Sequence, residues 1–144
     1  MYIALAIREA FLDAMTCRIL IVDCDENSRT ILSRRLARRG FEVVTVCEGH
    51  MAVAESVSLK PDVVLMDLSV VTSDSWRTAR EMKLHPETAQ IPIVAISVLD
   101  LAWDEEAAMQ AGCDVYLPKP INMDMLGDVL IKVSKSKCVP SEPT

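Results

Sequence analysis

The stretch that decides the fold is Val63-Val64-Leu65-Met66-Asp67, in which four apolar residues run directly into one carboxylate. Lys60-Pro61-Asp62 precedes it, and a stretch rich in Ser, Thr and Asp follows it. A short continuous apolar run between such segments is typical of a strand that is buried on both faces. Asp67 would then lie at the carboxyl end of a strand, where open α/β sheets bind ligands. Because an unpaired charge at the edge of a core is costly, we expect Asp67 to have a functional role.

Composition limits the classes of protein to consider. The chain has 144 residues, of which 51% are hydrophobic and 25% charged, so we expect one domain with a full core. The net charge of −6 argues against a nucleic-acid-binding face. No stretch approaches the roughly 20 apolar residues that span a bilayer. Five cysteines without a C-x-x-C pair predict neither a disulfide framework nor a zinc site, which favours a cytoplasmic location.

The ends of the chain differ from its middle. Residues 1–16 form an N-terminal extension that makes at most a short amphipathic helix, and we interpret it as a start-site artefact rather than a docking helix. Residues 17–135 carry the domain. Residues 136–144 contain two prolines and predict a flexible tail. We therefore expect no output domain after the last helix.

Other apolar runs resemble the first one. They predict strands over residues 18–22, 41–47, 91–97 and 115–117. Helical patterns lie between the runs, at residues 26–39, 49–59, 74–83, 104–111 and 122–134. In the first helix we expect Ile31, Leu32 and Leu36 to face inward, with a cap within Glu26-Asn27-Ser28 and a stop at Gly40. The second should bury Ala52, Val53 and Val57.

Regular alternation of strands and helices predicts the architecture. Short links between them indicate a parallel sheet with right-handed crossovers and helices on both faces, which is a doubly wound α/β fold.

Polar side chains follow several of the predicted strands. Asp23 ends the first strand, Asp67 the third and Ser97 the fourth, while Lys119 follows the fifth. In a parallel sheet these ends share one edge, so two carboxylates, a hydroxyl and an ammonium should converge. Each residue alone has a plainer explanation, as a cap, a turn former or a surface charge. The joint pattern is the stronger evidence.

The converging groups suit phosphoryl transfer. Two acids bind a hard cation such as Mg²⁺ through oxygen. A carboxylate can attack a phosphoryl group and become an aspartyl phosphate. The metal and Lys119 would neutralise charge, and Ser97 could donate a hydrogen bond to a phosphoryl oxygen.

Over residues 18–134 the sequence resembles the receiver (phosphoacceptor) domain of two-component response regulators. The matching runs are Ile19-Leu20-Ile21-Val22-Asp23, Val64-Leu65-Met66-Asp67-Leu68, Pro92-Ile93-Val94-Ala95-Ile96-Ser97, Ala111-Gly112-Cys113-Asp114-Val115-Tyr116-Leu117 and Lys119-Pro120. The resemblance implies a flavodoxin-like five-stranded sheet in the order 2-1-3-4-5, because members of this family have that strand order.

The resemblance also implies a role for each site residue. Asp67 would be the phosphoacceptor, Asp23 an acid of a Mg²⁺ site that Asp67 shares, and Lys119 the phosphate-binding cation. Ser97 would be the switch hydroxyl and Tyr116 the aromatic switch residue.

Several positions depart from the family pattern. Cys24 stands where a second acid is usual, and a thiol suits Mg²⁺ badly, so we expect weak metal binding. Asp25 is the alternative third ligand if the loop shifts. The loop over residues 69–75 lacks the usual proline and glycine, and Val98 stands where a small residue is usual.

We therefore expect a stand-alone receiver domain, not an enzyme, that accepts a phosphoryl group on Asp67 from a histidine kinase or phosphotransfer protein. Output would be protein–protein contact through the face with Tyr116 and the helix at residues 104–111, and homodimers stay an open alternative. A second hypothesis is a pseudo-receiver that binds partners without phosphorylation. A third is an aspartate-nucleophile phosphatase, ranked last because Ser69 stands where a second Asp is common.

Overall fold

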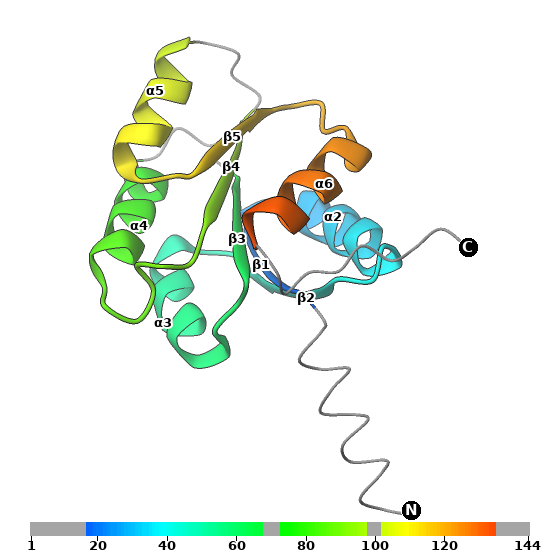
Figure 1. The fold of residues 1–144 in the computed structure, drawn as a ribbon, viewed down its shortest axis with the longest axis horizontal. Helices are drawn as coiled ribbons and strands as arrows, with labels where there is room; N and C mark the ends of the chain where they lie inside the picture. The colour runs from blue at the N-terminus through cyan, green and yellow to red at the C-terminus, as the bar shows by residue number, and fades with distance from the viewer. Residues whose placement is uncertain (1–16, 68–72, 98–101, 135–144) are drawn as a thin grey trace, which may run out of the picture.

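The computed structural model describes residues 17–67, 73–97 and 102–134 (Figure 1). The predicted extension 1–16 and tail 136–144 lie outside these ranges. Strands and helices alternate as predicted, and their bounds are β1 (Arg18–Val22), α2 (Glu26–Arg38), β2 (Glu42–Val46), α3 (Gly49–Leu59), β3 (Val63–Asp67), α4 (Ser73–Leu84), β4 (Ile93–Ser97), α5 (Ala102–Ala111), β5 (Val115–Pro118) and α6 (Met123–Val133).

The strands form one parallel sheet in the order β2-β1-β3-β4-β5, which confirms the predicted fold class. β3 lies at the centre, with Leu20 opposite Val64 on one side and Val94 opposite Leu65 on the other. The four apolar residues of β3 are at most 1% exposed. A strand flanked on both sides and covered on both faces has no polar face, which explains the uninterrupted apolar run.

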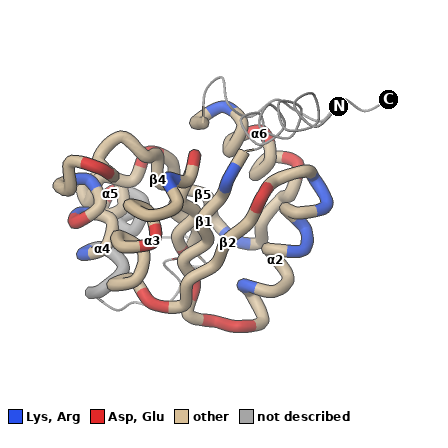
Figure 2. Tube along the Cα trace, turned by 90° about the horizontal axis from the view of Figure 1, so that it is seen from below, with Lys and Arg blue, Asp and Glu red and all other residues tan. Residues whose placement is uncertain are grey.

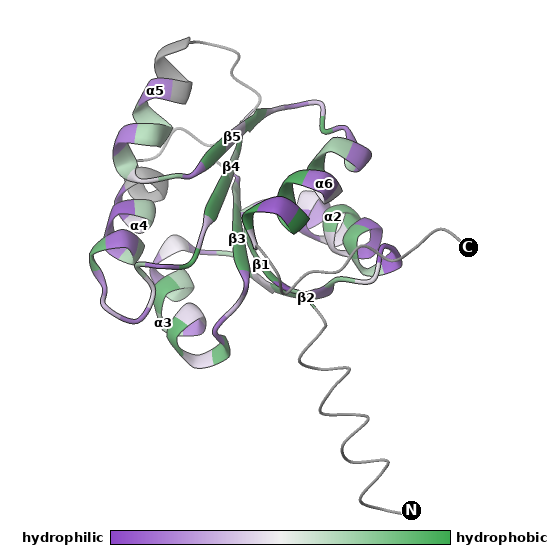
Figure 3. Ribbon diagram, in the orientation of Figure 1, coloured by the Kyte–Doolittle hydropathy of each residue, from purple (hydrophilic) through white to green (hydrophobic). Residues whose placement is uncertain are grey.

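Helices cover both faces of the sheet. α3, α4 and α5 lie on one face, and α2 and α6 on the other (Figure 1). The most hydrophobic segments are the central strands (Figure 3). Each face has its own core cluster: one includes Leu20, Met66, Met82, Ile93 and Ala108, and the other Ile19, Ile21, Leu36, Leu126 and Leu130. Each large apolar side chain buried in this way contributes about 1.5–3 kcal/mol, so the helices hold the strand ends firmly in place.

Two helices bury different residues from those predicted. In α2, Leu32 and Leu36 face the core, but Ile31 is 53% exposed. In α3, Ala52 is buried, but Ser56 is the other buried residue, while Val53 and Val57 are only half-buried. The apolar pattern was correct in period, but the small side chains of Ala52 and Ser56 allow the closest approach of α3 to the sheet.

The two ends of α2 are formed by different kinds of residue. Asp25 is the N-cap, and its carboxylate accepts hydrogen bonds from the Ser28 N–H at 3.1 Å and the Ser28 hydroxyl at 2.6 Å. The predicted cap within residues 26–28 was therefore one residue too late. Gly40 has a φ of +94°, which confirms the predicted stop, since this left-handed conformation favours glycine.

The beginnings of β4 and β5 are tied to α4. The Asp114 carboxylate accepts hydrogen bonds from the Ile93 N–H at 2.8 Å and from Lys83 Nζ at 2.9 Å. At Gly112, which has a φ of +106°, a Cβ atom would lie 2.7 Å from Lys83 Cγ. The glycine thus leaves room for Lys83 to reach Asp114. The contacts of Asp114 hold β4 and β5 in register at their beginnings, and this register determines where the two strands end.

The structure tests what composition predicted about the cysteines and about membrane-spanning helices. Cys17 takes part in a disulfide bond, so the expectation of no disulfide was wrong for this residue. Cys24, Cys47 and Cys113 are free thiols. Within the described ranges, no helix is long and apolar enough to cross a bilayer.

Candidate functional site

Asp67 and Lys119 meet at the carboxyl edge of the sheet. Lys119 Nζ donates to Asp67 Oδ2 at 2.5 Å, and the two side chains are only 22% and 11% exposed. The Lys119 N–H donates to the Ser97 carbonyl at 2.8 Å, which extends the β4–β5 pairing by one residue. The peptide bond from Lys119 to Pro120 is cis. The pairing of β5 with β4 therefore places the Lys119 ammonium next to the Asp67 carboxylate.

Asp23 is the second acid at this edge and is 4% exposed. Its Oδ1 accepts a hydrogen bond from the Asp25 N–H at 2.9 Å. Burial, with the neighbouring Asp67 carboxylate, raises the pKa of Asp23 from 3.8 to about 6, although the Asp25 N–H and Lys119 oppose this. The side chains of Asp23 and Asp67 are close enough to hydrogen-bond to each other. Two largely buried acids held this close repel each other, and the Lys119 ammonium offsets only part of their negative charge.

That shortage of positive charge fits a hard divalent cation. Carboxylate oxygens are the ligands that Mg²⁺ prefers, and it commonly keeps several waters as its other ligands. Asp23 and Asp67 would hold the ion, and Lys119 would add its own positive charge beside the Asp67 carboxylate. Among the residues that the structure describes, no group of three His, Cys, Asp or Glu side chains is placed to hold a metal. The donor set is therefore a two-carboxylate one.

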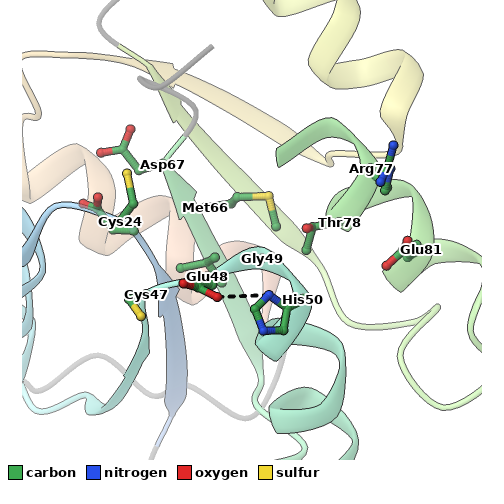
Figure 4. Close-up of a pocket in the computed structure, with 12 residues that line it drawn as sticks. Cys24, Cys47, Glu48, Gly49, His50, Met66, Asp67, Arg77, Thr78 and Glu81 are labelled. Carbon is green, nitrogen blue, oxygen red and sulfur yellow. Dashed lines mark ion pairs between the residues drawn. The ribbon is translucent and has the colours of Figure 1, made fainter. Parts of the chain in front are cut away.

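Neither candidate for a third ligand joins this pair. Asp25 is exposed, and its carboxylate is occupied by Ser28 as the cap of α2. Those two hydrogen bonds lower the pKa of Asp25. Cys24 is exposed and directs its sulfur toward the Asp67 side of the pocket (Figure 4).

Ser97 and Tyr116 lie on adjacent strands. Ser97 is 2% exposed at the end of β4, and Tyr116 pairs in register with Ala95 two residues earlier. Tyr116 packs against the core cluster that contains Ile93 and Ala95. Because alternate residues share a face of a strand, Ser97 points to the same side as Ala95 and so to the side of Tyr116.

Two hollows meet at the acid pair. One has a volume of about 580 Å³ and lies toward α3 and α4, with Cys24, Cys47 and Thr78 in its wall (Figure 4). The other has about 300 Å³ and an apolar wall formed by α2 and the segment after β5, with Ile31, Ile121 and Met123. Asp23 and Asp67 line both. The acids are therefore reached from two sides.

Some residues at the site were not predicted. Arg29 Nη1 donates to the Asp23 carbonyl at 2.7 Å and so fixes the backbone of the acid from α2. In the wall of the larger hollow, His50 Nδ1 lies 3.2 Å from Glu48 Oε2 (Figure 4). Arg29 lies on the helix face that Leu32 and Leu36 define, which could have indicated it. Cys47 follows β2 as Asp23 follows β1, a position that the strand pattern already contained. Residues 69–72 of the altered loop and Val98 lie outside the described residues, whereas residues 73–75 form the first turn of α4.

Comparisons with known proteins find related sequences and structures. The family model described as the response regulator receiver domain matches residues 19–131. The chain is 32% identical over 128 residues to response regulator PleD of Caulobacter vibrioides, a match that covers 89% of this chain and 28% of PleD. It is 27% identical to the polar-differentiation response regulator DivK of Brucella suis, with 76% of this chain and 89% of DivK covered. The chain thus spans less than a third of PleD but most of DivK.

Solved structures show the same fold. The receiver domain of sensor histidine kinase PA1611 from Pseudomonas aeruginosa, whose active-site cleft coordinates a magnesium ion, is 28% identical with a TM-score of 0.75. The match covers 83% of this chain and 98% of that one. The chemotaxis protein CheY4 of Vibrio cholerae, at 22% identity and a TM-score of 0.75 over 82% of this chain and 98% of CheY4, supports the fold alone.

Proposed function

The chain belongs to the response regulator receiver domain family, and from this premise we propose that Asp67 accepts a phosphoryl group from a phosphohistidine of a histidine kinase or phosphotransfer protein. The observation that carries the proposal is the contact between Lys119 Nζ and Asp67 beside the buried acid Asp23. Phosphoryl transfer to a carboxylate needs positive charge near the reacting oxygens. Lys119 supplies one such charge at Asp67.

In the proposed reaction, a carboxylate oxygen of Asp67 attacks the phosphorus atom and forms a P–O bond. The P–N bond to the donor imidazole breaks, and the imidazole leaves with its electron pair and takes up a proton. Lys119 is placed to move from the carboxylate to a phosphoryl oxygen, and the Ser97 hydroxyl to donate to another. When bound, Mg²⁺ would supply the remaining positive charge on the phosphoryl oxygens.

The donor would approach across the smaller hollow. Ile31 is 53% exposed there and Met125, on the neighbouring helix α6, is 54% exposed. Arginines gather along α2 in an otherwise acidic chain (Figure 2), and Arg34, Arg35 and Arg38 are exposed. An apolar centre with a positive rim favours a donor surface with exposed apolar side chains and acidic neighbours.

Incubation with acetyl phosphate and Mg²⁺ tests the acceptor. Intact mass spectrometry should show a single phosphoryl adduct on the wild type, and the adduct should be lost in Asp67→Asn. The matched control is Asp124→Asn, which changes an 86% exposed carboxylate outside the site and should keep the adduct. An adduct that persists in Asp67→Asn would show that the assignment is wrong.

Cys24 favours a second candidate, a pseudo-receiver that binds partners without phosphorylation. A thiol in place of an acid removes a hard ligand from the metal site. This candidate is supported if the wild type shows no adduct and the Cys24→Asp variant acquires one.

For either candidate we propose output through α5 and β5, where Tyr116 lies and Met109 is 48% exposed.

A further inference from the structure

Two free thiols follow neighbouring strands at the acid site. Cys47 is the first residue after β2, and Cys24 is the second residue after β1. Both are exposed, and both line the hollow of about 580 Å³ that Asp23 and Asp67 also line (Figure 4). Neither thiol has a role in the proposed phosphoryl transfer.

Strand pairing brings the two chain segments side by side. Val22 pairs with Val46, and the Asp23 N–H donates to the Val46 carbonyl at 3.2 Å, so the pairing continues to the strand ends. Cys24 and Cys47 lie in the bends that follow, on chain segments that leave neighbouring strands about 4.8 Å apart. Disulfides bridge Cα atoms that are about 4.4–6.8 Å apart.

The side chains are not yet oriented for a bond. In Figure 4 the Cys24 sulfur lies toward Asp67, and the Cys47 sulfur points away from it. Rotation about the Cα–Cβ bonds changes these positions, and exposed side chains move between such rotamers readily. A bond would therefore carry the Cys24 sulfur away from the acid pair.

We propose that Cys24 and Cys47 are a peroxide-sensitive pair whose disulfide changes the acid site. The sulfur of one residue attacks an oxygen of hydrogen peroxide, the O–O bond breaks, and a sulfenic acid and water form. The second sulfur attacks the sulfenic sulfur, the S–O bond breaks, and a second water leaves. Two thiols lose two electrons and peroxide gains them, and dithiothreitol would reverse the reaction.

The consequence for the site follows from the connections of Cys24, and this part rests on the proposed function. Cys24 lies between Asp23, which the acid site uses, and Asp25, whose N–H holds Asp23 Oδ1. A covalent tie to β2 would shift this segment and the hydrogen bond within it. Changes in groups that orient metal ligands cost about 10–100-fold in affinity.

Cys113 provides an internal control. Its side chain lies in the core at 3% exposure, and burial raises the pKa of the thiol to about 12. It therefore stays a protected thiol under mild oxidation.

Peptide mapping of the full chain tests the bond. After treatment with hydrogen peroxide and alkylation, trypsin should release peptides 19–29 and 40–77 as one cross-linked species, since Lys60 precedes a proline. The species should come from monomeric protein, disappear with dithiothreitol, and be absent in Cys24→Ser and in Cys47→Ser. Cys113→Ser should keep it. Separate sulfinic acids on the two peptides, or a bond between two chains, would overturn the proposal.

Beryllofluoride binding with Mg²⁺ tests the effect on the site. We expect oxidised wild type to bind at least about tenfold more weakly than reduced wild type. Oxidised Cys47→Ser, which cannot form the bond, should bind like its reduced form. Equal binding by oxidised and reduced wild type would overturn control of the site. Absence of binding in the reduced protein would instead count against the proposed function, and the cross-link map would then decide the proposal by itself.

Discussion

Asp23 is a buried acid that reduces the stability of the metal-free protein at neutral pH. Its folded pKa of about 6 lies above the ordinary value of 3.8, so the folded state holds a proton that the unfolded state releases. The contribution of Asp23 to stability is therefore greatest below about pH 4 and is lost as the pH rises through 6. A difference of one in pKa between the folded and unfolded states corresponds to about 1.4 kcal/mol, so the loss is on the order of 1–3 kcal/mol.

Asp23→Asn should remove this loss, because an amide of the same shape has no charge to bury and can still accept from the Asp25 N–H. Urea unfolding in EDTA at pH 5 and pH 7 measures it. The variant should gain stability relative to wild type at pH 7 and gain less at pH 5. Mg²⁺ should stabilise wild type and not the variant. An equal difference between the proteins at both pH values would contradict the prediction.

Ser56 is a small buried residue whose hydroxyl has no visible role. It is 0% exposed in α3, and within the described structure its hydroxyl has no hydrogen-bond partner. Ser56→Ala removes that unsatisfied group and improves helix propensity, so it should raise the free energy of unfolding by about 1 kcal/mol. Ser58→Ala changes an exposed position of the same helix and should give only the smaller propensity gain. Urea titration of both variants checks this, and destabilisation by Ser56→Ala would show that the hydroxyl is needed.

At the scale of the element, α2 is capped by Asp25, a residue that the sequence also offered as a metal ligand. Asp25→Ala removes the cap and should cost about 0.5–2 kcal/mol of stability, whereas Asp25→Ser should keep most of it because serine also caps well. If capping is the whole role of Asp25, wild type and Asp25→Ser should bind Mg²⁺ equally in calorimetric titrations. A clear loss of affinity in Asp25→Ser would identify Asp25 as a ligand of the metal site.

The elements also show what could be predicted from the sequence. Strand ends were predicted well because a doubly covered strand must be apolar along its whole length, as in β1 and β3. The position of Lys119 beside Asp67 followed from the parallel order alone. Side-chain details were less predictable: Ile31 faces solvent, and Asp25 caps α2, because helix orientation depends on contacts from distant parts of the chain. The inward face of α2 could indicate Arg29, but its contact with the Asp23 carbonyl depends on the angle of α2 to the sheet.

At the scale of the whole molecule, the sheet connects the acid site to the surface around Tyr116. A phosphoryl group on Asp67 would add negative charge and acceptor oxygens. Ser97 is placed to move toward them, which would open space beside β4 on the side of Tyr116. An aromatic ring that changes position presents a different apolar surface to a partner. A ligand shifts such an equilibrium only by its differential affinity for the two states.

Ser97→Ala should separate modification of the acid from this response. NMR shifts of residues 106–116, with and without beryllofluoride, measure the response in each variant. We expect clear shifts in wild type and in Ser97→Thr, which keeps a hydroxyl, and reduced shifts in Ser97→Ala although Asp67 still binds the analogue. If Ser97→Ala responds as fully as wild type, the hydroxyl is not the link. If wild type binds the analogue without shifts in this region, β5 and α5 do not respond to the acid site, and the conformational switch is absent.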